Sequence, residues 1–465
     1  MTKLSKACKP ISPEPPSGKS TTEDRTCIAK VGLFSRCRNF VLFVFYQVTL
    51  RTGWIFKTET IVMPAALDSL GGSIGLRSWL PLLNRFGQSI PPLLVSSRLK
   101  ILPIKKWSLA AATLGMALLF SGMASIWYFS DYLTLTFSST AIDCRPYLFL
   151  ILYGLFFAFT GVTVLAANTL QGKIISVGIR GRLMMVSNLL GTIVAVGAVL
   201  YLLPLWLKKE SGQFEYIFGF SALCFLLATL FVLLFREESV VHTRTARGIR
   251  HLFRDTWDLW AHDRPFRKLA VVSMLFTTSM LMFPHYQNIG ITQLDFQLTS
   301  LTLWLVLQNC GTAVFSILAG PLADRKGNKL VLHFLMFGMI SIPLLALLFL
   351  YFPAWGHRYF YVVFILLGFT PVTFKTLSNY ALEISTEADH PKYLSTLSLC
   401  QAIPILFSPI FGLVLEATNY VVGCFLVISL VGAGWLLTFR LIEPRHHLSE
   451  EEKSLAILSE EESEA

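Results

Sequence analysis

Long hydrophobic runs are the feature that most constrains the fold of this chain. Mostly apolar runs of at least 18 residues recur from about residue 40 to residue 441, and each could cross a hydrocarbon core of about 30 Å as a helix. Only 14% of the residues are charged and 54% are hydrophobic, whereas a soluble domain carries roughly 25% charge. The chain is therefore predicted to be an all-α, multi-pass membrane protein.

These runs predict twelve transmembrane helices. The expected spans are 39–66, 77–97, 107–130, 146–170, 183–206, 214–235, 267–290, 298–321, 329–351, 359–384, 393–416 and 419–441. Because 236–266 is the one long connection, the spans divide into two bundles of six helices. The predicted organisation is an N-terminal arm at 1–38, a bundle at 39–235, a linker at 236–266, a second bundle at 267–441 and an acidic tail at 442–465.

The distribution of lysine and arginine predicts the orientation. Alternate loops hold 19 of these residues and the opposite loops hold five, and positive loops stay on the cytoplasmic side. Both termini are therefore predicted to be cytoplasmic, in a plasma membrane such as a bacterial inner membrane. The arm at 1–38 is rich in Lys, Pro, Ser and Thr and is expected to be disordered. The net charge of +11 follows from this topology, so it does not indicate binding to nucleic acid.

The linker is predicted to contain an amphipathic helix. Its apolar residues recur at intervals of three to four, while arginines occupy another face: the apolar set is Ile249, Leu252, Phe253, Trp257 and Trp260, and the basic set is Arg247, Arg250 and Arg254. That pattern is typical of a helix on the inner membrane surface with tryptophans at headgroup level. Two interpretations remain open, a passive tether between the bundles and a regulatory surface helix.

A polar decapeptide, "GPLADRKGNK" at 320–329, interrupts the apolar sequence between two predicted spans. It resembles the G-x-L-a-D-r-x-G-r-k signature of the major facilitator superfamily, with Gly320, Asp324, Arg325, Gly327 and Lys329 in register. The resemblance implies the twelve-helix fold of that family and a secondary transporter. Glycines at these positions permit close helix approach and a tight turn.

The resemblance also implies a gate. Asp324 would meet the start of the span at 183–206, beside Arg180 and Arg182, when the cytoplasmic side closes. The corresponding loop of the first bundle, "PPLLVSSRLKILPIKKW", lacks the aspartate and the glycines and keeps only positive charge. This departure marks an atypical branch of the family.

Charged groups at bilayer depth are functional candidates, because an unpaired charge there costs several kcal/mol. The candidates for substrate binding are Gln47, Arg51, Arg85, Gln88, Gln308, Asn309 and Lys375, and Glu59 is the candidate for proton coupling. Alternatively, Glu59 pairs with Arg85 or Lys57 to hold the first two spans together. His285 is interpreted as a hydrogen-bonded residue near the outer end of its span.

Cations outnumber carboxylates among these groups, which favours an anionic or strongly polar substrate. The expected function is secondary transport of a small metabolite by a monomer, coupled to a proton or counter-substrate gradient. The alternatives are a transporter-like sensor that binds without transport and a lipid or lysolipid flippase. With no nucleotide-binding loop, metal-ligand spacing or catalytic triad in the sequence, an enzyme, a metal and a cofactor are not expected.

Overall fold

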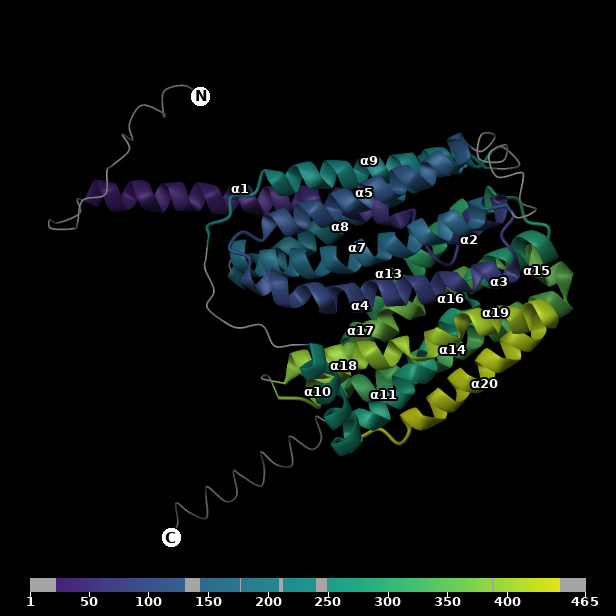
Figure 1. The fold of residues 1–465 in the computed structure, drawn as a ribbon. Helices are drawn as coiled ribbons and strands as arrows, with labels where there is room; N and C mark the ends of the chain where they lie inside the picture. Colours follow the sequence, from purple (N-terminus) through teal and green to yellow (C-terminus); the bar gives the residue numbers. More distant parts are fainter. Residues whose placement is uncertain are drawn as a thin grey trace, which may run out of the picture.

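A computed structural model describes residues 22–129, 143–175, 177–208, 212–239, 249–386 and 389–443. These residues form helices and connecting turns, and there is no strand among them. The helices run side by side as two bundles (Figure 1). The predicted all-α fold is therefore confirmed.

Nineteen α-helices in the described residues carry the fold, apart from short 3-10 and π segments. The first half contains α1 (Thr22–Ile55), α2 (Val62–Ser69), α3 (Ile74–Arg77), α4 (Trp79–Ile101), α5 (Lys106–Tyr128), α7 (Arg145–Ile174), α8 (Val177–Trp206) and α9 (Phe214–Leu233). The linker helix is α10 (Ile249–His262). The second half contains α11 (Arg264–Thr277), α12 (Phe283–Asn288), α13 (Ser300–Lys326), α14 (Asn328–Tyr351), α15 (Pro353–Tyr359), α16 (Tyr361–Leu367), α17 (Phe369–Glu383), α18 (His390–Ala402), α19 (Ser408–Ala417) and α20 (Tyr420–Thr438).

Ten of the predicted spans coincide with helical segments that are long and apolar enough to cross a membrane. They are the third to the twelfth spans. The first two correspond to α1 with α2 and to α4. Arg51 lies in α1, Glu59 lies between α1 and α2, and Arg85 lies in α4. The total of twelve crossings and the cytoplasmic position of both termini stay predictions. The boundary placed at residue 38 falls within α1, which begins at Thr22.

The sequence pattern predicts a single helix for the first span, but the structure divides this span into two helices. α1 ends at Ile55 and α2 begins at Val62. Between them the carbonyl of Thr58 accepts hydrogen bonds from three successive backbone amides, those of Ile61, Val62 and Met63. The seventh span is also irregular, with a 3-10 segment at Thr278–Met282 and a π segment at Ile289–Gln293. Such breaks are tolerated at membrane depth where protein surrounds them.

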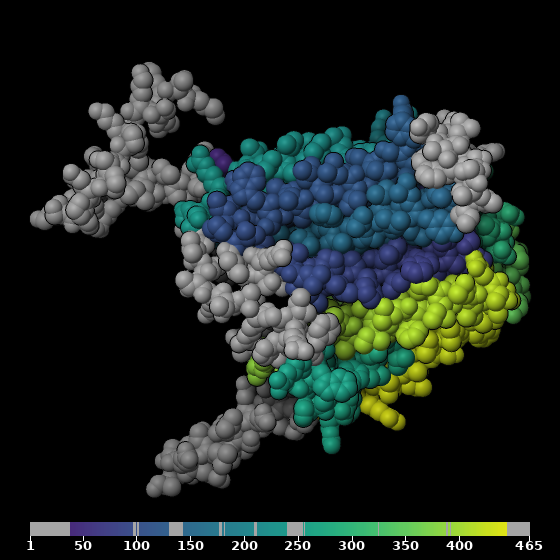
Figure 2. Space-filling model, viewed as in Figure 1, coloured from purple at the N-terminus to yellow at the C-terminus, as the bar shows by residue number. Residues whose placement is uncertain are grey.

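The two ends of the bundles differ in how the halves meet. We call the end with α2, α3 and α15 the outer end, following the charge distribution, and the end with α10 and the start of α18 the inner end (right and left in Figure 1). At the outer end α3 contacts α19 and α2 contacts α12. The surface of α4 lies against α18 and α19 (Figure 2).

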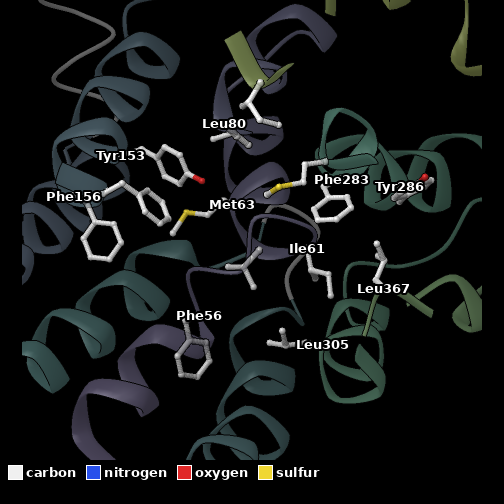
Figure 3. Close-up of a cluster of buried hydrophobic side chains, with 14 of the residues drawn as sticks. Phe56, Ile61, Met63, Leu80, Tyr153, Phe156, Phe283, Tyr286, Leu305 and Leu367 are labelled. Atoms are coloured by element: carbon white, nitrogen blue, oxygen red, sulfur yellow. The ribbon is translucent and has the colours of Figure 1, made fainter. Parts of the chain in front are cut away.

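Apolar side chains from both halves fill the space around the break in the first span. Ile61 lies toward Leu305 and Leu367 of the second half, and Met63 lies between Tyr153 of the first half and Phe283 of the second (Figure 3). All six side chains are at most 5% exposed. Burial of this size contributes roughly 1.5–3 kcal/mol for each large side chain, so the outer end is held closed by a shared core.

The crossing of α3 and α19 is close because a glycine lies at the contact. A Cβ atom added to Gly412 would lie 2.4 Å from Oγ of Ser78. The backbone amide of Gly75 donates a 2.8 Å hydrogen bond to the carboxylate of Glu416 at the same crossing. A side chain at position 412 is therefore incompatible with this closed outer end.

At the inner end a buried glutamate organises the first half. Glu237 accepts hydrogen bonds from the backbone amides of Lys105 and Lys106, at 2.9 and 2.7 Å, at the start of α5. It also forms a 2.7 Å ion pair with Lys173, and its side chain is 0% exposed. Burial and then repulsion by Lys173 lower the pKa of Lys105, while Glu237 opposes that change.

The second half repeats this arrangement. Glu443 follows α20 as Glu237 follows α9, and its carboxylate accepts a 3.2 Å hydrogen bond from the amide of Lys329 near the start of α14. Gly327 adopts φ +85°, and an added Cβ atom would collide with Glu443. The tight turn expected at Gly327 is therefore present. The close approach expected at Gly320 is absent, because a Cβ atom there would meet nothing within 4 Å.

The linker contains the predicted helix. α10 contacts α11 and α18, with Leu259 buried and Trp257 69% exposed. An exposed tryptophan beside the inner end fits a position at the membrane surface.

Replacement of Gly412 by valine is expected to shift the molecule toward an open outer end. The added side chain would overlap Ser78, so the distance between spin labels at Lys208→Cys and Thr418→Cys should increase in a cysteine-free background. Gly432 in α20 offers the matched control, because an added Cβ atom there meets nothing within 4 Å. An unchanged distance distribution for Gly412→Val in folded protein would contradict this account of the crossing.

Replacement of Glu237 by alanine is expected to destabilise the protein by about 2 kcal/mol, because two backbone amides and Lys173 lose their acceptor. Thermal unfolding in detergent measures the loss. The neighbouring Glu238 is exposed, so Glu238→Ala should unfold at the wild-type temperature. Equal effects of the two substitutions would refute the specific role of Glu237.

Candidate functional site

The break between α1 and α2 places Glu59 inside the protein, where its side chain meets α4. Nδ2 of Asn84 donates a short hydrogen bond to Oε2 of Glu59, and Nε2 of Gln88 donates one to Oδ1 of Asn84. Glu59 is 8% exposed, Asn84 is 9% exposed and Gln88 is exposed. A chain of polar groups therefore leads from the surface of α4 to a buried carboxylate. Oε1 of Glu59 has no hydrogen-bond partner.

Arg85 lies on the same helix and reaches the opposite half. Its guanidinium carbon lies 4.1 Å from the centre of the Phe374 ring on α17. Nη2 contacts the sulfur of Met280 at 3.7 Å, and Nε is buried without a hydrogen-bond partner. A thioether is a weak acceptor, so this guanidinium has stacking contacts but lacks an oxygen acceptor among the described residues.

The alternative in which Glu59 forms a direct ion pair with Arg85 or Lys57 is not what the structure shows. The ion pairs formed between described residues join Arg77 to Asp68, Arg145 to Asp143 and Lys173 to Glu237. Arg85 and Lys57 nevertheless attract the Glu59 carboxylate at longer range. One carboxylate thus faces two cations without pairing closely with either.

Lys57 is held by aromatic rings. Its ammonium nitrogen lies 4.6 Å from the centre of the Phe157 ring and 5.2 Å from that of Trp54. Ring faces attract a cation within about 6 Å. These contacts compensate for the loss of water around Lys57.

Arg51 has a different neighbour. Its Nη1 donates a 2.8 Å hydrogen bond to Oδ1 of Asn188 on α8, and Gly191 leaves room for its stem. Gln47, one turn earlier on α1, is half-buried. The structure therefore gives Arg51 and Arg85 separate partners, although the sequence analysis assigned both to substrate binding.

On the second half, Gln308 meets the break in the first span. Thr60 donates a 2.7 Å hydrogen bond to Oε1 of Gln308. Asn309 instead bonds the carbonyl of Leu305 in its own helix at 2.8 Å. Gln308 thus connects the two halves one residue away from Glu59, and Asn309 does not.

Lys375 belongs to an exposed polar stripe on α17. Pro371, Lys375 and Asn379 are exposed at intervals of four residues, and α17 is flanked by α11, α13, α14 and α18. Phe374, at the edge of this stripe, contacts Arg85 of the other half. The stripe therefore lies on the side of α17 that is turned toward the first half.

The residues of the expected gate lie at the inner end, and in this conformation Arg180 bonds within its own half. Its side chain donates hydrogen bonds to the carbonyls of Ile175 at 3.1 Å and Gly172 at 2.6 Å. Arg182 and Arg325 are exposed. The side chain of Asp324 lies outside the described residues, so the latch between Asp324 and the start of α8 stays a prediction.

A polar network at the outer end was missed by the sequence analysis. Asp68 pairs with Arg77 and accepts a 3.2 Å hydrogen bond from Asn288. Tyr420 donates a 2.6 Å hydrogen bond to Asn288, and Arg77 donates a 3.5 Å one to Tyr420. The available signal was that Asp68 and Arg77 are charges placed just beyond apolar runs. We call the contacts of Asp68, Arg77, Ser78, His285, Asn288, Ser408, Glu416 and Tyr420 the outer seal.

A separate hollow lies at the inner surface. It has a volume of about 660 Å³ and lies between α10, α11 and the start of α18, with Asp258, His262, Arg264 and Lys392 in its lining. These residues are remote from Glu59 and Arg85 along the helices and include charges of both signs. We therefore place the candidate site at the break in the first span. No cluster of three metal-ligating side chains occurs within the described ranges.

Comparison with solved structures relates the whole chain to known transporters. A mutant of the nucleoside transporter NupG superposes with a TM-score of 0.68 at 13% identity, covering 88% of this chain and 100% of the other. A bacterial homologue of the iron transporter ferroportin, in an inward-facing state, gives 0.67 at 12% identity, with coverages of 87% and 98%. A D-xylose-proton symporter gives 0.60 at 16% identity, with coverages of 86% and 98%. At such identities the likeness shows the fold.

Comparison at the level of sequence gives one family. Curated protein sequences give no match. The model of the Major Facilitator Superfamily matches residues 269–460, which include the decapeptide with the family signature. The first half, whose inner loop lacks that signature, lies outside the match. The second half therefore resembles the Major Facilitator Superfamily in sequence, and the chain, a multi-pass membrane protein, shares the fold of these solved transporters.

Proposed function

We propose that this protein transports a small anionic metabolite across the plasma membrane, and that Arg85 binds the anion. The observation that carries the proposal is the state of the Arg85 guanidinium. It lies between the two halves, against Phe374 and Met280, without an oxygen acceptor among the described residues. A buried guanidinium N–H without an acceptor, such as Nε of Arg85, is costly unless a ligand or water supplies one. A carboxylate or phosphate matches the planar guanidinium with two parallel hydrogen bonds.

Lys375 and Gln88 are the other binding candidates that the geometry supports. Lys375 faces the first half from α17, and Gln88 is exposed three residues after Arg85 on α4. Arg51 and Gln47 lie one turn apart on α1, and Gln308 lies on α13. Asn309, which bonds its own helix, is the weakest of the predicted set.

Glu59 is proposed to couple transport to a proton gradient. Its carboxylate is buried, one oxygen has no partner, and Arg85 and Lys57 attract it. Loss of its proton would leave a charge that Arg85 stabilises, and an anion bound to Arg85 would compete for that stabilisation. Proton uptake by Glu59 would therefore favour anion binding, which is the linkage that a symporter needs.

The transport cycle is proposed to follow alternating access between two bundles. Hydrogen bonds at the outer end close that side, and the polar stripe of α17 is exposed, which supports an inward-open state. In the outward-open state the inner end would close through the decapeptide and the start of α8. The protein is proposed to work as a monomer with twelve spans and cytoplasmic termini.

The two alternatives differ from this proposal in what they require. A sensor would bind the anion without moving it. A flippase would place its cations near a lipid headgroup portal, whereas Arg85 and Lys375 lie within α4 and α17 at positions between the helix ends. The central position favours a water-soluble substrate.

Replacement of Arg85 by glutamine is expected to weaken anion binding on the order of tenfold or more, because a charge-assisted pair is lost. A panel of anionic, neutral and cationic metabolites is screened by thermal shift, and any stabilising anion is tested for uptake into proteoliposomes. Arg85→Lys should restore little, since lysine cannot form the planar double contact.

Arg145 provides the control for the arginine variants. It pairs with Asp143 at the start of α7, so Arg145→Gln should keep wild-type binding and uptake. Stabilisation by anions that persists unchanged in Arg85→Gln would remove the basis of the proposal. Binding without uptake by the wild type would indicate the sensor instead.

Replacement of Glu59 by glutamine is expected to abolish uptake driven by a pH gradient while exchange of labelled for unlabelled substrate continues. The amide keeps the contact with Asn84 but cannot release a proton. Glu215→Gln, at the start of α9, is the control and should retain both activities. If Glu59→Gln still accumulates substrate against a gradient when protons drive it, Glu59 is not the coupling residue.

A further inference from the structure

His285 is a completely buried histidine at the contact between the two halves. It lies on α12 and is 0% exposed. Its Nε2 lies 3.0 Å from the hydroxyl oxygen of Ser78, which follows α3 in the first half. Ser78 is held from the second half as well, because Ser408 donates a hydrogen bond to its carbonyl. The ring thus sits where the outer seal must separate when the outer end opens.

The hydrogen bonds around Ser78 determine where the ring carries its proton. The Ser78 hydroxyl donates to the carbonyl of Ile74 at 3.3 Å. Its oxygen is then free to accept a hydrogen bond from Nε2 of His285. The other nitrogen, Nδ1, is buried and has no hydrogen-bond partner. The closed seal therefore fits a neutral imidazole with its proton on Nε2.

A second proton on His285 would not be compensated in the closed seal. It would lie on Nδ1, where no acceptor is present, and Arg77 adds a repulsive positive charge. The remaining neighbours are the rings of Phe411 and Tyr420, at 6.2 and 6.1 Å between ring centres.

The nearby carboxylates are already engaged. Asp68 binds Arg77 and Asn288, and Glu416 accepts from the amide of Gly75. Neither contacts the imidazole. Charge on His285 is therefore accommodated only after the two halves part and water reaches the ring.

We propose that His285 is a proton-binding site of the outer seal, and that proton binding from the outer side opens the seal. Closing the outer end expels this proton, and acidity outside holds the end open. The direction follows from linkage: the state that binds the proton is stabilised as pH falls. The ring titrates with the ordinary imidazole pKa of about 6.5 in the open, hydrated state, and the preference for the closed state moves the midpoint of opening below that value.

This site is distinct from Glu59, because it acts on the seal whatever the substrate is. A transporter and a ligand sensor with this fold would both show it. If the proposal for His285 fails, the proposed anion transport is unaffected. If the proposed anion transport fails, the proposal for His285 is equally unaffected.

The test measures opening of the outer end against pH. Spin labels at Lys208→Cys and Thr418→Cys, in a cysteine-free full-length chain in lipid nanodiscs, report the distance between the halves from pH 8 to pH 5. The expected result is a growing long-distance population as the pH falls, with a midpoint at or below about pH 6.5. Absence of any such transition in the wild-type background overturns the proposal without reference to variants.

Two substitutions identify the responsible group. His285→Gln can still donate to Ser78 and should remove the pH response. His357→Gln alters another histidine at the outer end, in α15, and should retain it. A response that survives His285→Gln overturns the proposal and would assign opening to another group, such as Asp68 or Glu416.

Discussion

A charge in the membrane interior must have a partner, and the contact between the two halves is organised by that constraint. Where partners are available within the protein, as for Asp68 with Arg77 and Asn288, the halves are joined at the outer end. Where they are incomplete, as for Arg85 and one oxygen of Glu59, the interface has the capacity to bind something else. The same physical rule thus separates the part of the interface that closes the outer end from the part that is proposed to bind the substrate.

The outline of the fold could be predicted from the sequence because hydrophobic run length is a strong signal. The third to twelfth spans coincide with apolar helices. The break after Ile55 could not be predicted in the same way, because Lys57, Thr58, Glu59 and Thr60 also suit a helix that carries charges. Its stability comes from apolar side chains of the other half, such as Phe283 and Leu305, and no local pattern reports a tertiary contact of this kind.

The candidate site was predictable as a set of residues, and its contacts were not. Arg51 and Arg85 look equivalent in sequence, yet Asn188 satisfies one of them and an aromatic ring covers the other. The inner end shows a similar limit. Glu237 and Glu443 cap equivalent helix starts in the two halves, although only the second half keeps the family signature nearby. In both halves a carboxylate that follows the last helix of the bundle accepts hydrogen bonds from backbone amides at a helix start. The loop sequence of the first half, which lacks the signature, gives no indication of this contact.

The stacking of Arg85 on Phe374 joins residues from different bundles. One bundle supplies the charge, and the other supplies the surface that shields it from water and fixes its plane. The affinity for the proposed anion would then depend on both bundles and on their separation, since the guanidinium and the ring that covers it come from different bundles. In such an architecture, a substitution of Phe374 could change the selectivity for the proposed anion while Arg85 and the helices around it stay the same.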